Sequence, residues 1–195
     1  PDGSVTFACI GQFNNVSDLI DSQPDEYSAL SGVELVRRKV KKFVVMGGLF
    51  GDGVQFHGAY YELEYNVVTD IPSARNFVRK CPVPVVFCDF LAGYRVLTGG
   101  PLLQKKDPMN PVTAAYRIFQ DSPRESWDPL TVWYAIYGWE PLFTQSPNGV
   151  VTVQSNGKTL FSPSDQGKHS YLRLAVSELV CANTIDEMLL RSETI

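Results

Sequence analysis

Two continuous apolar runs constrain the fold of this chain most. Lys42–Met46 has the sequence KFVVM, and Val83–Asp89 holds the most hydrophobic strand candidate. Neither run alternates with polar residues, which is typical of strands that are covered on both faces, as in parallel sheets. A further strand is predicted at Ser4–Ile10, where β-branched and aromatic residues are frequent. We therefore expect these three segments to form the centre of a buried sheet.

Helices are predicted between the three strands. Val16–Ile20 and Ser31–Lys39 follow the first strand, and Ser73–Arg79 follows the second, with Asp70 and Pro72 at its start. A side-chain acceptor and a proline are both favoured at a helix N-terminus. The order strand, helix, strand, helix, strand implies parallel crossovers. The sequence therefore predicts an α/β fold with a mostly parallel sheet and flanking helices.

The last third of the chain has a different character. Asn156 and Gly157 stand between two β-rich runs, Val150–Val153 and Thr159–Phe161, which predicts a late β-hairpin. Three more helices are predicted, at Pro111–Phe119, Pro129–Tyr137 and Ile185–Arg191. The 195 residues contain no internal repeat and no linker, so we expect a single domain over residues 1–195.

Charge and hydropathy exclude two classes of partner. The net charge is -4 and the sequence pI is about 5.2, whereas a nucleic-acid-binding protein needs a basic surface to neutralise phosphates. The longest apolar runs have the length of strands, too short to span a membrane. We expect a soluble protein, either cytoplasmic or secreted, with no nucleic-acid or membrane partner.

The four cysteines carry no metal signature. They form no CxxC pair, and their spacing fits no zinc pattern. Cys9 and Cys88 lie inside strand-like apolar runs, where a free thiol packs as a small hydrophobic group. The sequence therefore favours buried free thiols over disulfides.

Ligands of open α/β sheets bind beyond the carboxyl ends of the strands. In this chain, the residues that follow the strands are Asn14 and Asn15, then Gly47 and Gly48, and finally Asp89. A loop at Gln12–Asn15 and a longer irregular loop at Gly51–Tyr61 would border the same edge.

Glu64 and Asn66 form the first candidate site pair. They are two residues apart in a segment that we expect to be extended, so both side chains would project to the same side. A carboxylate and an amide together can hydrogen-bond a polyol. The alternative is a solvated strand edge followed by a helix cap at Asp70.

Asp128 and Trp127 form the second candidate pair, because they stand just before the apolar helix. Asp128 is either an ordinary cap or an oxygen ligand for a metal ion. Trp127 either stacks on a planar base or fills the core. The two histidines, His57 and His169, lack the spacing of metal ligands.

Taken in order, five short motifs resemble the inosine-uridine-preferring nucleoside hydrolase family. The motifs are Gly11-Gln12-Phe13-Asn14-Asn15-Val16, Val44-Val45-Met46-Gly47-Gly48, Glu64-Tyr65-Asn66 with Asp70, Pro82–Asp89, and Trp127-Asp128-Pro129-Leu130. They occur in the family order and extend over nearly the whole chain. The resemblance implies hydrolysis of the N-glycosidic bond of ribonucleosides, with a calcium ion that binds the ribose and a water.

The resemblance also implies roles for individual residues. Asp128 matches an aspartate ligand of the calcium, and Asn14 matches a residue that binds the metal through its backbone carbonyl. Glu64 and Asn66 match the pair that hydrogen-bonds the ribose. Met46 falls in the strand-end motif that lines the sugar pocket.

Two departures from the family pattern affect the expected activity. Trp127 stands where studied members have a histidine that protonates the leaving base, and His169 is the candidate for a replacement acid. The Asp-x-Asp-x-x-x-Asp-Asp motif, which supplies most metal ligands and the general base, has no counterpart in this chain. We therefore expect that about the first third of the family fold is missing, and that the chain alone hydrolyses no nucleoside.

Three functions are consistent with these residues. The first is a nucleoside hydrolase completed by a companion chain or fragment that carries the aspartates. The second is a catalytically inactive subunit with a structural or interaction role, and the third is a ribose- or nucleoside-binding module. A ribonucleoside is the expected ligand in the first and third cases. Oligomers are common in the family.

Overall fold

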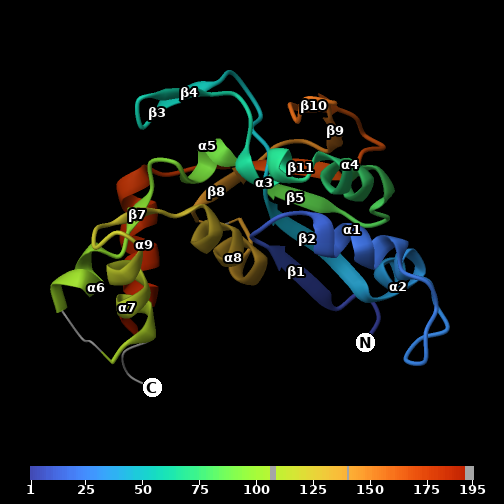
Figure 1. Cartoon of the computed structure of the whole chain (residues 1–195), viewed down its shortest axis with the longest axis horizontal. Coiled ribbons are helices and arrows are strands. Elements are labelled where there is room, and N and C mark those ends of the chain that lie inside the picture. The colour runs from blue at the N-terminus through green and yellow to red at the C-terminus, as the bar shows by residue number, and fades with distance from the viewer. Residues whose placement is uncertain (106–108, 140, 192–195) are drawn as a thin grey trace.

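The computed structural model describes residues 1–105, 109–139 and 141–191, and the predicted parallel sheet lies at its centre. β1 (Val5–Cys9) pairs with β2 (Val40–Met46), and β2 pairs with β5 (Val85–Cys88). All three strands are parallel, as Figure 1 shows. Their carboxyl ends therefore meet at one edge of the sheet, which is the edge predicted to carry the site.

The sheet continues beyond β5 with strands from the last third of the chain. β11 (His169–Leu174) pairs in parallel with β5 and antiparallel with β9 (Gly149–Val153). β9 and β10 (Thr159–Pro163) form the predicted hairpin. A short strand, β8 (Phe143–Gln145), pairs with the second half of β11. The result is a mixed sheet with a parallel centre.

Helices cover both faces of the sheet, because alternate side chains of a buried strand point to opposite faces. Phe43 and Val45 pack on one face beneath α1 (Asn14–Asp21), α2 (Gly32–Lys39) and α4 (Ile71–Lys80). Val44 and Val86 pack on the other face, against α8 (Trp127–Tyr137) and α9 (Glu178–Arg191). The continuous apolar runs of β2 and β5 supply both cores, as the sequence predicted.

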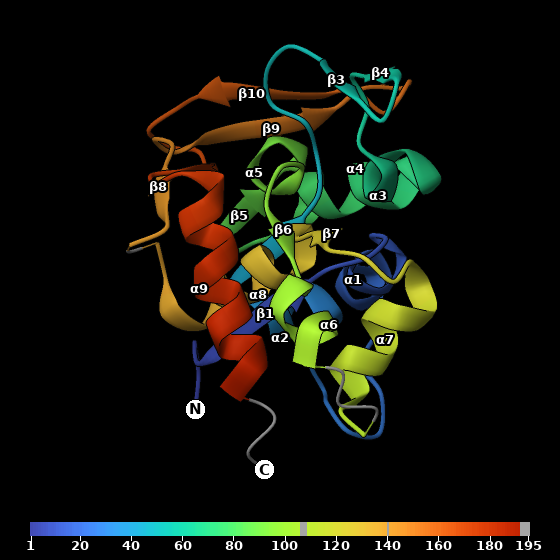
Figure 2. The same cartoon turned by 90° about the vertical axis from the view of Figure 1, so that its left-hand side faces the viewer.

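The remaining elements lie beyond the carboxyl edge and at one end of the sheet. Near the carboxyl edge are β3 (Val54–Phe56), β4 (Ala59–Tyr61), α3 (Tyr65–Thr69) and α5 (Phe90–Gly93). At the end are β6 (Leu97–Thr98), α6 (Gly100–Lys105), α7 (Pro111–Phe119) and β7 (Arg124–Glu125). Figure 2 shows α6 between α9 and α7, and α6 contacts both of these helices.

Several predicted boundaries are wrong. Gly51–Tyr61 is not an irregular loop, because β3 and β4 form a hairpin in it, with His57 at φ 48° beside Gly58 in the turn. The first helix starts at Asn14, inside the predicted loop Gln12–Asn15, and the last helix starts at Glu178 instead of Ile185. The sequence analysis also missed β11, which holds the hairpin against the parallel strands.

The prediction of free thiols is confirmed. Cys81, Cys88 and Cys181 are buried and Cys9 is half-buried, and all four are free.

Within residues 1–105, 109–139 and 141–191, no helix has the length and apolar character needed to cross a membrane.

Candidate functional site

The ends of β2 and β5 form the floor of the candidate site. Met46 pairs with Cys88, so Gly47 and Asp89 leave the sheet side by side. The backbone N–H of Phe90 donates to the carbonyl oxygen of Gly48 at 2.9 Å, which ties the two strand ends together. Glycine is needed at position 47, because a Cβ there would lie 2.8 Å from the ring of Phe13.

Glu64 is buried above this floor, with only 3% of its surface exposed. The segment is not extended as predicted, because Glu64 is the N-cap of α3. Its carboxylate accepts three backbone N–H groups: Asn66 at 2.7 Å, Gly48 at 3.1 Å and Val67 at 3.1 Å. A helix of only five residues needs such a cap, and the same carboxylate fastens it to the end of β2.

Burial controls the protonation of Glu64. Desolvation raises the pKa of its carboxyl from 4.5 to about 7, against the lowering effect of the three backbone N–H groups. The negative charge of Asp128 raises this pKa further, which places the two carboxylates within electrostatic reach of each other. Asp128 also raises the pKa of the Cys88 thiol at the end of β5.

Asn66 and Met46 are in direct contact at the same edge. The Asn66 side-chain amide donates to the carbonyl oxygen of Met46 at 3.2 Å and lies 3.1 Å from its sulfur. Asn66 is half-buried and Met46 is buried. The amide N–H groups of Asn66 are thus oriented by the strand end, and its amide oxygen has no partner among the described residues.

Asp128 lies within the first turn of α8 and not before the helix as predicted, since α8 already begins at Trp127. It is not the helix cap, because the N-cap residue is Ser126. Burial raises the pKa of Asp128, while the positive charge of Arg124 lowers it. A half-buried carboxylate without a capping role is available to a ligand.

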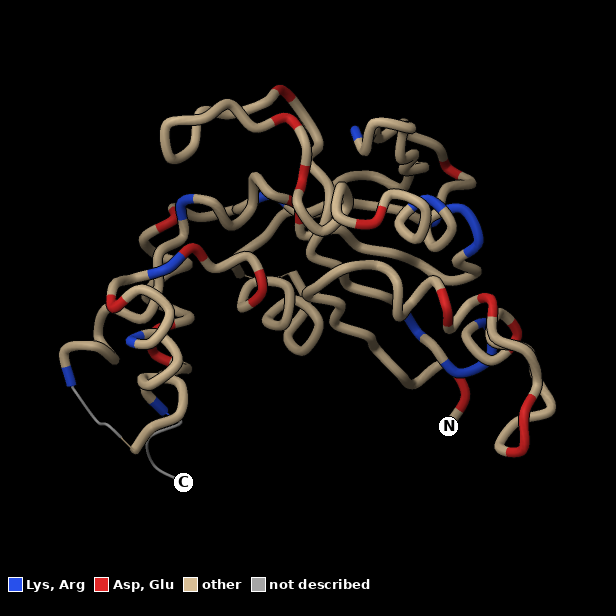
Figure 3. The backbone as a smooth tube through the Cα atoms, viewed as in Figure 1, with Lys and Arg blue, Asp and Glu red and all other residues tan. Residues whose placement is uncertain are grey.

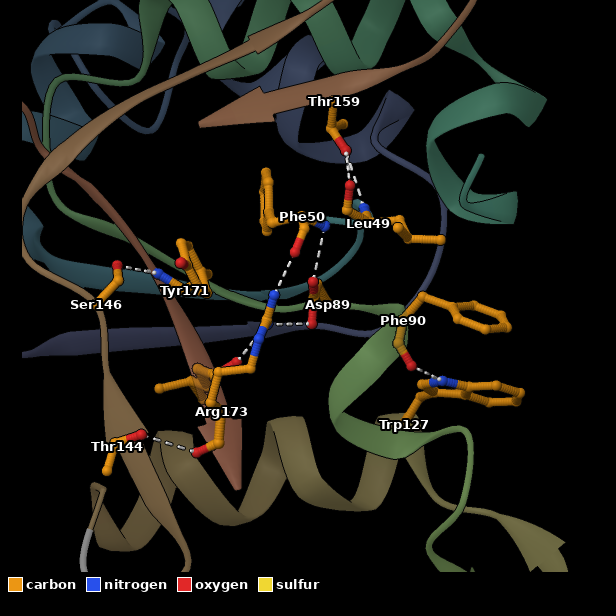
Figure 4. Close-up of polar contacts among 11 residues, drawn as sticks. Leu49, Phe50, Asp89, Phe90, Trp127, Thr144, Ser146, Thr159, Tyr171 and Arg173 are labelled. Carbon is orange, nitrogen blue, oxygen red and sulfur yellow. Dashed lines mark hydrogen bonds and ion pairs between the residues drawn. The ribbon is translucent and has the colours of Figure 1, made fainter. Parts of the chain in front are cut away.

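Trp127 is held in an aromatic cluster. Its indole N–H donates to the carbonyl oxygen of Phe90 at 2.9 Å, as Figure 4 shows. Its ring packs against Phe56 from the β3–β4 hairpin and against Phe90, with centroids 5.8 Å and 5.3 Å away. The indole donor is therefore already used, which leaves the ring as a stacking surface.

Asn14 lies near the carboxyl edge of the sheet, whereas His169 lies at the opposite edge. Asn14 is exposed at the start of α1, next to Phe13, whose ring lies against Gly47. His169 pairs with Val85 at the opposite, amino end of β5. Its Nδ1 accepts the backbone N–H of Val151 at 2.8 Å. The structure thus brings Asn14 towards the predicted site and leaves His169 away from it.

Asp89 was predicted at the end of a strand, but its partner Arg173 and the neighbouring Thr159, which shape the loop after β2 together with it, were not predicted. Asp89 is fully buried, and it accepts the backbone N–H of Phe50 at 2.9 Å and the guanidinium of Arg173 at 2.8 Å. Arg173 also donates to the carbonyl oxygen of Phe50, while Thr159 binds both backbone groups of Leu49 (Figure 4). Arg173 lies in the missed strand β11, so no local pattern could pair it with Asp89.

A calcium site held by this chain alone does not fit the described residues. Among them, no group of three or more His, Cys, Asp or Glu side chains is placed to hold a metal ion. Calcium takes about six to eight oxygen ligands, and several are usually carboxylates. The resemblance predicted only two ligands from this chain, Asp128 and the carbonyl of Asn14, and the carboxylate of Glu64 already accepts three backbone N–H groups.

Comparison with known proteins supports the fold. No protein-family model and no curated protein sequence matches the chain. Among solved structures, it is similar to a plant nucleoside hydrolase, with a TM-score of 0.64 and 19% identity over 96% of this chain and 62% of the other. It is also similar to the inosine-uridine preferring nucleoside hydrolase from Bacillus anthracis, with a TM-score of 0.61 and 18% identity over 93% of this chain and 57% of the other.

The chain spans less than two thirds of the length of these two enzymes. At such low identity, the similarity concerns the fold and not the chemistry. The mixed sheet with its parallel centre and flanking helices is therefore a nucleoside-hydrolase-like fold.

Proposed function

We propose that this chain provides the ribose-binding side of a nucleoside hydrolase, which becomes active when further carboxylates complete it. One observation carries the proposal. Glu64 and Asn66 at the start of α3 and Asp128 in the first turn of α8 come from separate parts of the chain and converge at the carboxyl edge of the parallel strands. That edge is where α/β folds bind their ligands, and the fold is nucleoside-hydrolase-like.

Each of the three residues has a distinct part in this proposal. The amide of Asn66, fixed by Met46, and the carboxylate of Asp128 bind the hydroxyl groups of the ribose. Glu64 positions Asn66, because it holds the backbone N–H of Asn66 at 2.7 Å and caps the helix that carries it. The ring of Trp127 offers a face on which the nucleoside base stacks.

The companion segment in this proposal has a place to bind. β1 is the last strand of the sheet, and its second edge pairs with no strand of the described residues. An unpaired edge presents backbone N–H and C=O groups to another strand. Val5, the first residue of β1, and Ile10, the residue that follows it, are 41% and 44% exposed. A segment that carries aspartates and adds to this edge would bring them beside the ends of β1 and β2.

A second candidate is a nucleoside-binding module without chemistry, or an inactive subunit built on the same fold. The specific observation in its favour is that the polar groups of Trp127 and Glu64 already have hydrogen-bond partners within the chain. The indole N–H of Trp127, its only side-chain donor, already donates to the carbonyl oxygen of Phe90, and the Glu64 carboxylate accepts three backbone N–H groups. Neither residue is then available to protonate a leaving base. The binding module predicts the same ligand and no turnover, whereas the inactive subunit predicts neither ligand binding nor turnover.

Titration calorimetry with inosine and uridine tests the binding part of the proposal. Asn66→Ala and Asp128→Asn are expected to weaken binding by about tenfold or more, because each removes hydrogen bonds to a buried polar ligand. Asn183→Ala is the matched control, because Asn183 is an exposed residue of α9. Equal losses in all three variants, or no saturable binding by the wild-type chain, would refute the ribose site.

Two further measurements separate the enzyme from the binding module. We expect the purified chain to release no ribose from inosine or uridine, even with calcium, because its described carboxylates form no metal-holding group. Intact-mass analysis and peptide mapping of the native material should then find the aspartates, on a longer chain or on a tightly bound companion. If the native material is this 21.7 kDa chain alone, the binding module is the better description.

A further inference from the structure

A cavity lies away from the candidate ribose site. It is a groove of about 1090 Å³ between α4, β9 and the segment that leads into β11. Neither Glu64, Asn66 nor Asp128 lines it. A volume near 1000 Å³ is at the upper end of the range for small-molecule sites. The groove is therefore large enough for a ligand of its own.

The lining of this groove is basic. Arg75, Arg79 and Lys168 line it, and none of its sixteen lining residues is Asp or Glu. This is unusual in a chain whose net charge is -4. Figure 3 shows basic positions gathered along α4, on the right of the view, where Arg75 and Arg79 lie four residues apart.

The two arginines have no ion pair with any described residue. Like charges at this helical spacing repel each other by a few tenths of a kcal/mol. The carboxylate of Asp21 is close enough for Arg79 to lower its pKa, but Asp21 bonds to Lys80 at 2.6 Å and to Asn76 at 2.8 Å. Lys168 donates to the carbonyl oxygen of Pro82 and retains further N–H groups. The guanidinium groups of Arg75 and Arg79 are therefore available to an anion.

A buried histidine adds a neutral donor to the same groove. His169 lines it and is 6% exposed. Since Nδ1 accepts the N–H of Val151, the ring hydrogen is on Nε2, which has no hydrogen-bond partner among the described residues. Burial lowers the pKa of His169 to about 4, so the ring stays neutral at physiological pH. A single unpartnered N–H of this kind suits an acceptor oxygen.

Much of the remaining lining is apolar, although it also includes four polar residues, Asn76, Thr152, Ser155 and Gln166. Ile71 and Val78 of α4 and Val151 and Val153 of β9 belong to this apolar part of the lining. Ligand sites commonly combine such apolar walls with a few polar groups that fix the orientation of the ligand. The combination therefore indicates a ligand with one strongly anionic end and an apolar body.

We propose that this groove binds a small organic phosphate, with the phosphate between Arg75, Arg79 and Lys168 and the apolar body against β9. Phosphate is favoured over carboxylate because three cations match a group of charge near minus two. The planar guanidinium also bonds two phosphate oxygens at once. The site is independent of the ribose site, since the two share no residue.

Phenyl phosphate is a suitable probe, because it joins a phosphate to a small apolar ring. Its binding is followed by NMR, through the backbone amide of Val151 and the ring signals of His169. We expect saturable chemical-shift changes at both residues. Phenyl phosphate should bind with an affinity about tenfold or more above that of benzoate or phenol. The double variant Arg75→Gln, Arg79→Gln should lose about tenfold or more in affinity.

Lys41→Gln in β2 is the matched control, because Lys41 is exposed and does not line the groove. It should bind phenyl phosphate within about twofold of the wild type. Equal losses in the control and the double variant would show a non-specific charge effect and overturn the site. The phosphate assignment would also fail if benzoate bound as well as phenyl phosphate, or if phenyl phosphate caused no saturable shift.

Discussion

Asp89 and Arg173 form an ion pair at 2.8 Å, although 84 residues separate them in the sequence. Asp89 directly follows β5 and its side chain has no exposed surface, while the side chain of Arg173 is 34% exposed. Together they hold both backbone groups of Phe50 and thereby fix the loop that follows β2 (Figure 4). Arg173 of β11 therefore helps to hold the loop that borders the candidate ribose site.

Removal of Arg173 should destabilise the chain strongly. Arg173→Ala leaves the Asp89 carboxylate buried without its charged partner, which costs about 3 kcal/mol of unfolding free energy. Urea unfolding measures the loss. Arg38→Ala is the control, because Arg38 pairs with Asp2 on the surface and a surface pair contributes little. A similar loss in both variants would show that the buried pair has no special role.

Gly48 is the second residue on which this loop depends. It has φ +82°, and a Cβ there would lie 3.0 Å from the ring of Phe50 and 3.3 Å from Oγ1 of Thr159. In urea unfolding, the free energy of unfolding of Gly48→Ala should therefore be about 2 to 3 kcal/mol lower than that of the wild type, because of backbone strain and crowding. Gly3 has φ +62° with no atom within 4 Å of a Cβ, so Gly3→Ala should lose only about 1 kcal/mol. Equal losses of unfolding free energy in Gly48→Ala and Gly3→Ala would show that contacts with Phe50 and Thr159 add no cost at Gly48.

The parallel core could be predicted because its signals are local. The continuous apolar run of β2 requires cover on both faces, and the Asn-Gly turn between β9 and β10 fixes a hairpin. β11 was missed because His169, Ser170 and Arg173 interrupt its apolar character. These polar residues are satisfied by Val151, Gln145 and Asp89, which are distant in the sequence. Such a strand is defined by its partners and not by its own pattern.

The candidate site was predictable in its place but not in its details. The strand-end rule located Gly48 and Asp89 correctly, because parallel strands share one carboxyl edge. The extended geometry predicted for Glu64 and Asn66 is wrong, since a buried carboxylate can cap a short helix and start it at once. No sequence pattern shows that the Trp127 N–H is engaged, because its partner is the backbone of Phe90.

Glu64 should give the chain a distinctive pH dependence. Its pKa is about 7 in the folded chain, above the ordinary 4.5, so the folded state binds the proton more tightly than the unfolded state. Its contribution to stability is complete below about pH 4.5 and is lost as the pH rises to about 7. Glu64→Gln cannot titrate, so the stability of the wild type relative to this variant should fall across that window.

Urea unfolding of both proteins at several pH values measures this difference. Asp89, whose pKa is raised by burial to about 6, titrates in both proteins and therefore cancels. Above about pH 7 the difference should be constant. A difference that is flat from pH 4 to pH 8 would mean that the three backbone N–H groups cancel the desolvation of Glu64, and a difference that grows with pH would mean that they outweigh it.

The four thiols should react slowly in the folded chain. Burial raises the pKa of Cys9 and Cys88 to about 12 and that of Cys81 and Cys181 to about 11, so little thiolate exists at pH 8. A chromogenic disulfide reagent should titrate four thiols rapidly in urea and should react much more slowly with the native protein. Cys9, the one half-buried thiol, should be the first to react, and Cys9→Ser should remove that phase. Rapid reaction of several thiols in the native chain would mean that the two apolar cores open readily in solution.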